Sequence, residues 1–117
     1  MAAPDLDIVR GTLDVLILKT LSWGPMHGLG VLRWIERTSR EQLQIEEGAL
    51  YPALHRLEQK GHLEAEWGVT ERNRQAKFYK LTRAGRGALV AEVTRWNRYT
   101  SAVDLILSAE SAAAGAA

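Results

Sequence analysis

One segment, residues 46–81, changes its hydrophobic period halfway along, and this limits the possible folds more than any other feature. Its first part, EEGALYPALHRLEQKG, spaces apolar residues along one helix face and ends at Gly61, a residue typical of helix C-termini. Apolar and polar residues then alternate singly, as in a half-buried strand, before a polar loop and a second strand at residues 76–81. The expected inward positions are Leu50, Ala53, Leu54, Leu57, Leu63, Ala65 and Trp67.

This order predicts a winged helix-turn-helix, a mainly α fold with a small two-stranded β-wing (α+β). Such folds place one helix in the DNA major groove and a hairpin on the adjacent backbone. A helix with Thr12 as its N-cap and a second helix over residues 26–38 are expected upstream, and Thr82 is expected to cap a long final helix. We therefore expect a DNA-binding domain over residues 1–81, a dimerisation helix over 82–110 and a disordered tail over 111–117.

Composition excludes several other classes of protein. The 117 residues include 46% hydrophobic and 25% charged residues, as in an ordinary folded domain. There is no cysteine, no apolar run long enough to span a bilayer and no signal-peptide pattern, which fits a cytoplasmic protein. The three histidines lack metal-ligand spacing and no nucleophile motif is present, so no catalytic residue, cofactor or metal is expected.

Basic residues concentrate in one part of the chain although the net charge is only +1. Residues 56–86 contain eight arginines and lysines against four glutamates. A local basic footprint is what binding to phosphates requires. The alternative is a solvated charged surface with no ligand.

The solvent-facing side of the helix that begins near residue 47 is the candidate DNA-reading surface. Gly48 permits close approach of the backbone, and Arg56 can contact a phosphate or a guanine. Tyr51 can pack against a sugar or a thymine methyl, or it can be a core aromatic residue with its hydroxyl at the surface. The three cations near the hairpin tip suit a contact with the DNA backbone or the minor groove, and the alternative is an ordinary solvated turn. The complete candidate DNA-binding set is Gly48, Tyr51, Pro52, His55, Arg56, Gln59, Arg72, Arg74 and Lys77.

The last helix carries an apolar stripe at heptad-like spacing and has no core of its own left to cover. Its natural partner is the same helix of a second subunit, which predicts a homodimer. The alternative is a stripe that folds back onto its own domain. The candidate interface residues are Leu89, Val93, Trp96, Thr100, Val103 and Leu107.

Three stretches, GTLDVLILKTLSWGPMHGLGV, EEGALYPALHRLEQKGHLEAEW and RQAKFYKLTRAGR, resemble PadR-type transcriptional regulators. The resemblance covers about residues 10–107. It implies a winged helix-turn-helix that dimerises through its C-terminal helix, usually represses transcription and belongs to the short-tailed branch with one helix after the wing. Many relatives have an aromatic residue in place of Leu29 and a hydroxyl residue in place of Ala49, so operator preference cannot be copied from them.

The resemblance also implies a possible small aromatic effector, because some family members bind phenolic acids or flat drugs between the first and last helices. Trp23, Trp96 and Tyr99 could form walls of such a pocket, but Trp96 at helical spacing is more often part of a dimer core than a ligand wall. The sequence predicts a transcriptional regulator that binds double-stranded DNA at a two-fold related operator. We expect it to act as a repressor. A winged-helix module that only contacts other proteins is the alternative.

Overall fold

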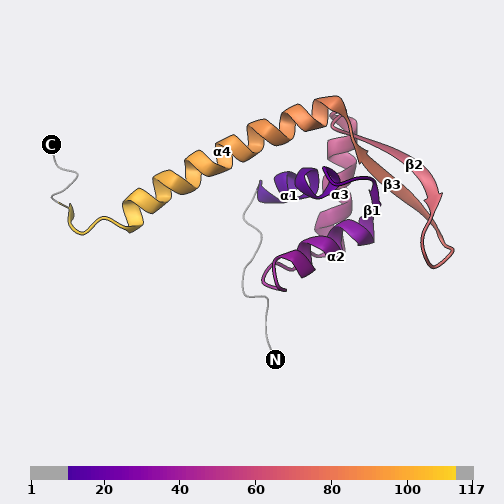
Figure 1. Ribbon diagram of the computed structural model, residues 1–117, viewed down its shortest axis with the longest axis horizontal. Coiled ribbons are helices and arrows are strands. Elements are labelled where there is room, and N and C mark those ends of the chain that lie inside the picture. The colour runs from indigo at the N-terminus through magenta and orange to yellow at the C-terminus, as the bar shows by residue number, and fades with distance from the viewer. Residues whose placement is uncertain (1–10, 113–117) are drawn as a thin grey trace.

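The computed structural model describes residues 11–112 and has four helices and a three-stranded antiparallel sheet (Figure 1). This arrangement confirms the expected α+β winged-helix fold. None of the helices in this range is long and apolar enough to cross a membrane. The elements are α1 (Thr12–Leu21), β1 (Met26–His27), α2 (Gly28–Thr38), α3 (Glu47–Gln59), β2 (Leu63–Val69), β3 (Gln75–Leu81) and α4 (Arg83–Leu107).

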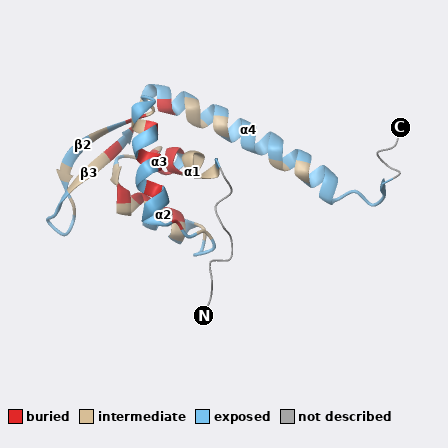
Figure 2. Ribbon diagram, turned by 180° about the vertical axis from the view of Figure 1, so that it is seen from behind, coloured by how far each residue is buried: buried red, intermediate tan, exposed pale blue. Residues whose placement is uncertain are grey.

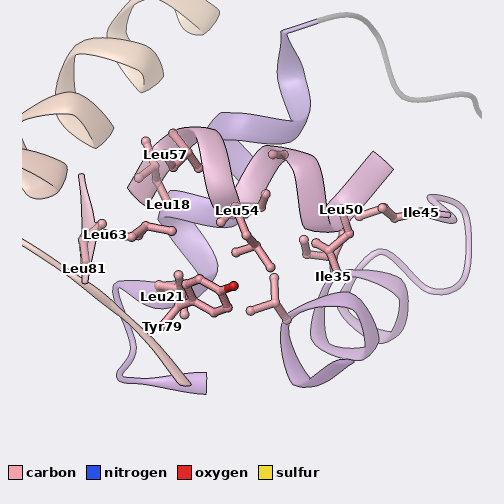
Figure 3. Close-up of a cluster of buried hydrophobic side chains, with 13 residues drawn as sticks. Leu18, Leu21, Ile35, Ile45, Leu50, Leu54, Leu57, Leu63, Tyr79 and Leu81 are labelled. Carbon is pink, nitrogen blue, oxygen red and sulfur yellow. The ribbon is translucent and has the colours of Figure 1, made fainter. Parts of the chain in front are cut away.

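The hydrophobic core lies where α1, α2, α3 and the inner end of the sheet meet. In Figure 3, leucines of α3 point toward side chains of the other two helices, and Leu63, Tyr79 and Leu81 close the cluster from the sheet. The four apolar positions expected on α3 are all buried, as helical spacing predicted. The core residues are Ile17, Leu18, Leu21, Val31, Ile35, Ile45, Leu50, Ala53, Leu54, Leu57, Leu63, Tyr79 and Leu81.

The sheet differs from the expected two-stranded wing because a third strand joins it. The strand order is β1-β3-β2, and Met26 pairs with Tyr79 while His27 pairs with Phe78. A strand of two residues leaves no periodic signal in a sequence, so the prediction extended the second helix through it. β2 also runs to Val69, further than expected, and leaves a five-residue tip at residues 70–74.

Two predicted positions in the first half of the chain are wrong. Thr12 is the first residue of α1 and not its N-cap; the cap is Gly11, whose φ of 87° gives a left-handed turn that favours glycine. α2 begins at Gly28 and not at residue 26. His27 caps it, because its side chain accepts a hydrogen bond from the backbone N–H of Gly30.

The start of α4 is fastened to the end of α3, and Thr82 caps it as predicted. The Thr82 hydroxyl accepts from the N–H of Gly85 at 3.0 Å and donates to the carbonyl of Gly61 at 2.6 Å. The Thr82 N–H donates to the carbonyl of His62 at 3.1 Å. That same carbonyl lies so close to Gly85 that an added Cβ would stand 2.1 Å from its oxygen. The junction therefore requires a residue without a side chain at position 85.

Beyond this junction α4 leaves the body of the molecule, as Figures 1 and 2 show. Leu89 packs against the core of its own chain, so part of the predicted stripe does fold back. Val93 and Trp96 are exposed, Thr100 and Val103 are half-buried, and the stripe is exposed again at its end. Of the expected tail at residues 111–117, positions 113–117 lie outside the described residues.

The junction gives a stability prediction with an internal control. Gly85→Ala should lower the free energy of unfolding by about 1–3 kcal/mol, because the new methyl group would overlap the His62 carbonyl. Gly87→Ala, two residues further along α4, meets no atom within 4 Å and should raise stability by roughly 0.5–1 kcal/mol through helix propensity. Urea denaturation of both variants measures the difference, and equal effects would contradict the close approach.

Candidate nucleic-acid interface

The solvent-facing side of α3 is open along its whole length. All six candidate residues on this helix are exposed, while the opposite side fills the core. No atom lies within 4 Å of a Cβ added at Gly48, so the backbone at the start of α3 is accessible to a ligand. α3 thus presents one polar face outward, as a helix that enters a groove of DNA must. These six residues are Gly48, Tyr51, Pro52, His55, Arg56 and Gln59.

Tyr51 fits both interpretations that its sequence position allowed. Its ring packs against the start of α2, since a Cβ added at Gly28 would lie 2.6 Å from the ring and 2.9 Å from the hydroxyl. The side chain is nevertheless 42% exposed. Partial burial, and then the nearby carboxylate of Glu47, raise the pKa of the Tyr51 hydroxyl, which keeps it a hydrogen-bond donor at neutral pH. Tyr51 therefore joins α3 to α2 and still offers its hydroxyl to the surface.

Arg56 has a partner that the sequence did not indicate. Its guanidinium donates to the carboxylate of Asp14 in α1 at 2.7 Å, and its side chain remains half exposed. Surface ion pairs contribute little to stability, typically about 0–1 kcal/mol. The pair holds the arginine on the flank of α3 that faces α1, away from the flank occupied by Tyr51.

Lys77 links the wing to α3. Its amine lies 3.2 Å from the carboxylate of Glu58 and 5.7 Å from the centre of the Tyr79 ring. β3 therefore contacts α3 through an ion pair outside the core, and Lys77 remains partly exposed in this pair. The arrangement places one predicted cation of the wing directly beside the exposed face of α3.

The hairpin tip is a compact turn that carries two free cations. The Thr70 N–H donates to the carbonyl of Arg74 at 2.8 Å, and the Asn73 N–H donates to the carbonyl of Thr70 at 2.9 Å. Asn73 adopts a left-handed conformation with φ of 58°, which asparagine tolerates well. Within residues 11–112, no ion pair occupies Arg72 or Arg74.

A groove of about 940 Å³ runs between α2, Tyr51 of α3 and the wing. Five cations line it against a single carboxylate, that of Glu71. The start of a helix also presents free backbone N–H groups and the positive end of its dipole, which favour phosphate. This groove suits the backbone of a nucleic acid. Its cations are Arg33, Arg37, Arg72, Arg74 and Lys77.

The contribution of α2 to this groove was missed from the sequence. His27 caps the helix through Nδ1, which requires a neutral imidazole, and its ring lies 5.4 Å from that of Phe78 in β3. Arg33, one and a half turns further, extends the basic lining. The available signal was the short segment HGLG, whose two glycines let the Tyr51 ring and the His27 side chain come close to the start of the helix.

The aromatic residues considered for an effector are not gathered in one place. The rings of Trp96 and Tyr99 lie 6.2 Å apart on α4, and both side chains are exposed. Trp23 follows the end of α1, where Lys19 lies over its ring at 5.0 Å. In the described part of the chain, no ring contact joins Trp23 to the other two.

Comparison with known proteins gives one consistent result. Residues 17–91 match the transcriptional regulator PadR-like family. An uncharacterized protein from Lysinibacillus sphaericus is 31% identical over 86% of this chain and 93% of its own. A transcriptional regulator from Mycobacterium tuberculosis is 34% identical over 71% of this chain and 74% of its own.

Solved structures agree with the sequence relatives. A PadR family transcriptional regulator from Eggerthella lenta has a TM-score of 0.74 and 29% identity, covering 86% of each chain. A protein from Streptococcus mutans has a TM-score of 0.75 and 27% identity, covering 95% of this chain and 97% of its own.

The contact between Gly28 and Tyr51 can be tested as a pair. Gly28→Ala should lower the free energy of unfolding by about 1–3 kcal/mol, because the methyl group would displace the tyrosine ring. In a Tyr51→Ala background the same change should be close to neutral. Denaturant unfolding of the four proteins gives the coupling energy between the two positions. Equal costs in both backgrounds would show that the ring does not rest on this glycine.

Proposed function

We propose that this chain, which belongs to the PadR-like family of transcriptional regulators, represses transcription by binding a two-fold related operator as a homodimer. The family consists of regulators and not of enzymes. The observation that carries the proposal is the open face of α3 beside a groove lined by five cations and one carboxylate. The relatives named above come from bacteria, whose DNA lies in the cytoplasm, so we place the protein there.

The proposed contacts divide among three elements. The exposed face of α3 enters the major groove, where Tyr51, His55 and Gln59 meet base edges. The start of α2 and the basic lining of the groove bind phosphates, and Arg72 and Arg74 at the hairpin tip bind the adjacent backbone. Base contacts supply sequence preference in this scheme, whereas phosphate contacts supply most of the affinity.

We base the proposed dimer on the part of α4 that does not pack against the rest of its own chain. Beyond Leu89, the stripe Val93, Trp96, Thr100, Val103 and Leu107 lies on a helix that projects from the body (Figure 2). We propose that it packs against the same helix of a second subunit in a two-fold interface. The two copies of α3 would then reach half-sites about one helical turn apart, roughly 34–36 Å.

An effector is a further part of the proposal. A flat aromatic compound beside Trp96 and Tyr99 would act at the dimer helix and change the separation of the two α3 helices without touching DNA. It can do so only if it binds the DNA-competent and DNA-incompetent dimers with different affinity. Trp23 is less suited to this pocket, because its ring contacts Lys19 and neither of the other two aromatic residues.

The proposal is tested by a gel-shift assay with the duplex that flanks the protein's own coding region. Specific binding that survives competition by unrelated duplex supports an operator-binding regulator. A module that only contacts proteins would bind neither duplex, and it would need no basic groove. A reporter gene placed behind the bound fragment then separates repression from activation.

If the basic residues near α3 contact phosphates, removing them should change how operator affinity depends on salt concentration. Arg56→Ala and Lys77→Ala should each weaken operator binding and reduce the slope of log K against log salt by about one for each lost phosphate contact. Arg95→Ala is the control, because this arginine pairs with Glu92 on α4, away from the groove. Slopes that stay unchanged in both test variants would place the DNA on a different surface.

The dimer helix can be tested with a single charge. Val103→Asp would bury an unpaired carboxylate in the proposed interface, at a cost of about 3–5 kcal/mol per uncompensated charge. Sedimentation should show a monomer, and operator binding should fall sharply because one half-site gives weak affinity. Ser101→Asp adds the same charge at an exposed position outside the stripe and should remain dimeric. A Val103→Asp protein that is dimeric at micromolar concentration would contradict this interface.

A further inference from the structure

We infer that Trp67 and Val69, on one face of β2, form an apolar contact with the sugar–phosphate backbone of the duplex bound at α3. The wing would then hold DNA by packing as well as by charge. This inference rests on the proposed function and assigns a partner to Trp67, which lies outside the basic groove, and to Val69, which lines the groove at its wing side. Trp67 is not part of the buried core, so its large apolar side chain does not stabilise the fold of this chain by burial.

The two side chains continue an inward-facing row after the core has ended. Leu63 at the start of β2 is buried and Ala65 is half-buried, whereas Trp67 is 71% exposed and Val69 is 60% exposed. The alternating pattern predicted an inward position for Trp67, and the residue does lie on the same side of the sheet as Leu63, but it is exposed because burial along β2 ends before it. An indole is among the largest apolar side chains, so covering it with a ligand is favourable.

Cross-strand neighbours leave the indole uncovered. Trp67 stands opposite Lys77, and Val69 stands opposite Gln75. The Lys77 amine is directed to Glu58 of α3 and to the Tyr79 ring, toward the inner end of the sheet. The face that carries Trp67 is therefore continuous with the exposed flank of α3, where the proposed DNA surface begins.

The distribution of charge on the hairpin favours a polyanion as the occupant. Side chains of a strand alternate between its faces, so Glu64 and Glu66 lie on the side opposite Trp67. Glu64 is within 3.9 Å of Lys80 on that opposite side, and Phe78 there lies close against Gly68. On the Trp67 side, β2 and β3 carry Lys77 and no carboxylate, and the neighbouring carboxylate of Glu58 in α3 is already paired with Lys77. A basic protein partner would find no unpaired negative charge on these strands.

An aromatic ring beside a cation is a common arrangement for holding nucleic acid, because stacking and packing tolerate any sequence while the cation binds phosphate. The C–H edges of deoxyribose offer the apolar surface that Trp67 and Val69 require. Lys77 beside them, and Arg72 and Arg74 at the tip, lie close enough along the hairpin to meet neighbouring phosphates. We therefore assign the backbone rather than the bases to this contact.

Tryptophan emission and salt dependence together test the assignment. The probes are the duplex upstream of the protein's own coding region and an unrelated mixed-sequence duplex at low salt. Emission of the parent protein should fall on binding, and most of this change should disappear in Trp67→Phe. Trp23→Phe removes another exposed indole, at the end of α1, and should retain it. Trp67→Ala should weaken binding by roughly tenfold, the scale expected when part of a large apolar side chain is no longer covered.

The slope of log K against log salt should be the same in Trp67→Ala as in the parent, because no charge is removed. Lys77→Ala should reduce that slope, which separates packing from charge at neighbouring positions. Since Trp67 is exposed, its variants should unfold at nearly the parent temperature. If the alanine variant does not fold, the emission test with Trp67→Phe decides alone.

Three outcomes overturn the inference. Binding by Trp67→Ala equal to that of the parent removes the contact but leaves the proposed function standing. If the DNA-dependent quenching is lost in Trp23→Phe and kept in Trp67→Phe, the fluorescence change comes from Trp23 and not from Trp67. A changed sedimentation coefficient with unaltered DNA affinity assigns this face to a second copy of the chain. If the parent binds neither duplex, the proposed function fails together with the inference.

Discussion

Complete burial of one face of α3 is the constraint on which the structure depends. Side chains of α1 and α2, together with Leu63 and Leu81 of the sheet, cover Leu50, Leu54 and Leu57 on this face. Each of these side chains contributes about 1.5–3 kcal/mol when removed from water. The opposite face of the helix is left free because it carries only small, polar or charged residues and Tyr51. The exposure of that face to a possible ligand is thus a consequence of the burial of the other face.

The same asymmetry explains which parts of the fold could be predicted from the sequence. Helical spacing identified the buried side of α3, and the change of period identified the hairpin, since both patterns arise from burial on one side. β1 was missed because two residues show no period, and Trp67 was misplaced because alternation continues where the core does not. Thr82 was predicted correctly as a cap, since threonine before a long helical pattern has few other uses.

The candidate site was predictable in composition but not in its pairings. The candidate residues of α3 and the two arginines at the hairpin tip are exposed, as expected, whereas Lys77 is half-buried. The partners of Arg56 and Lys77 come from 42 and 19 positions away along the chain, so no local pattern could indicate Asp14 or Glu58. The lining from α2 was likewise missed, because only the folded chain brings Arg33 next to the hairpin. Both ion pairs orient a cation more than they stabilise the fold.

The close packing of Gly85 against the His62 carbonyl fixes the point from which α4 projects, so that α4 can act as a lever. A helix of 25 residues is about 37 Å long, so a tilt of roughly 10° at this fulcrum would displace its far end by about 6 Å. The fulcrum lies where α3 ends and β2 begins, and α4 also packs against α1, so a tilt of α4 would act on α1 as well as on α3 and the hairpin. The packing at one glycine would then determine how much of a change at the distal end reaches the exposed face of α3.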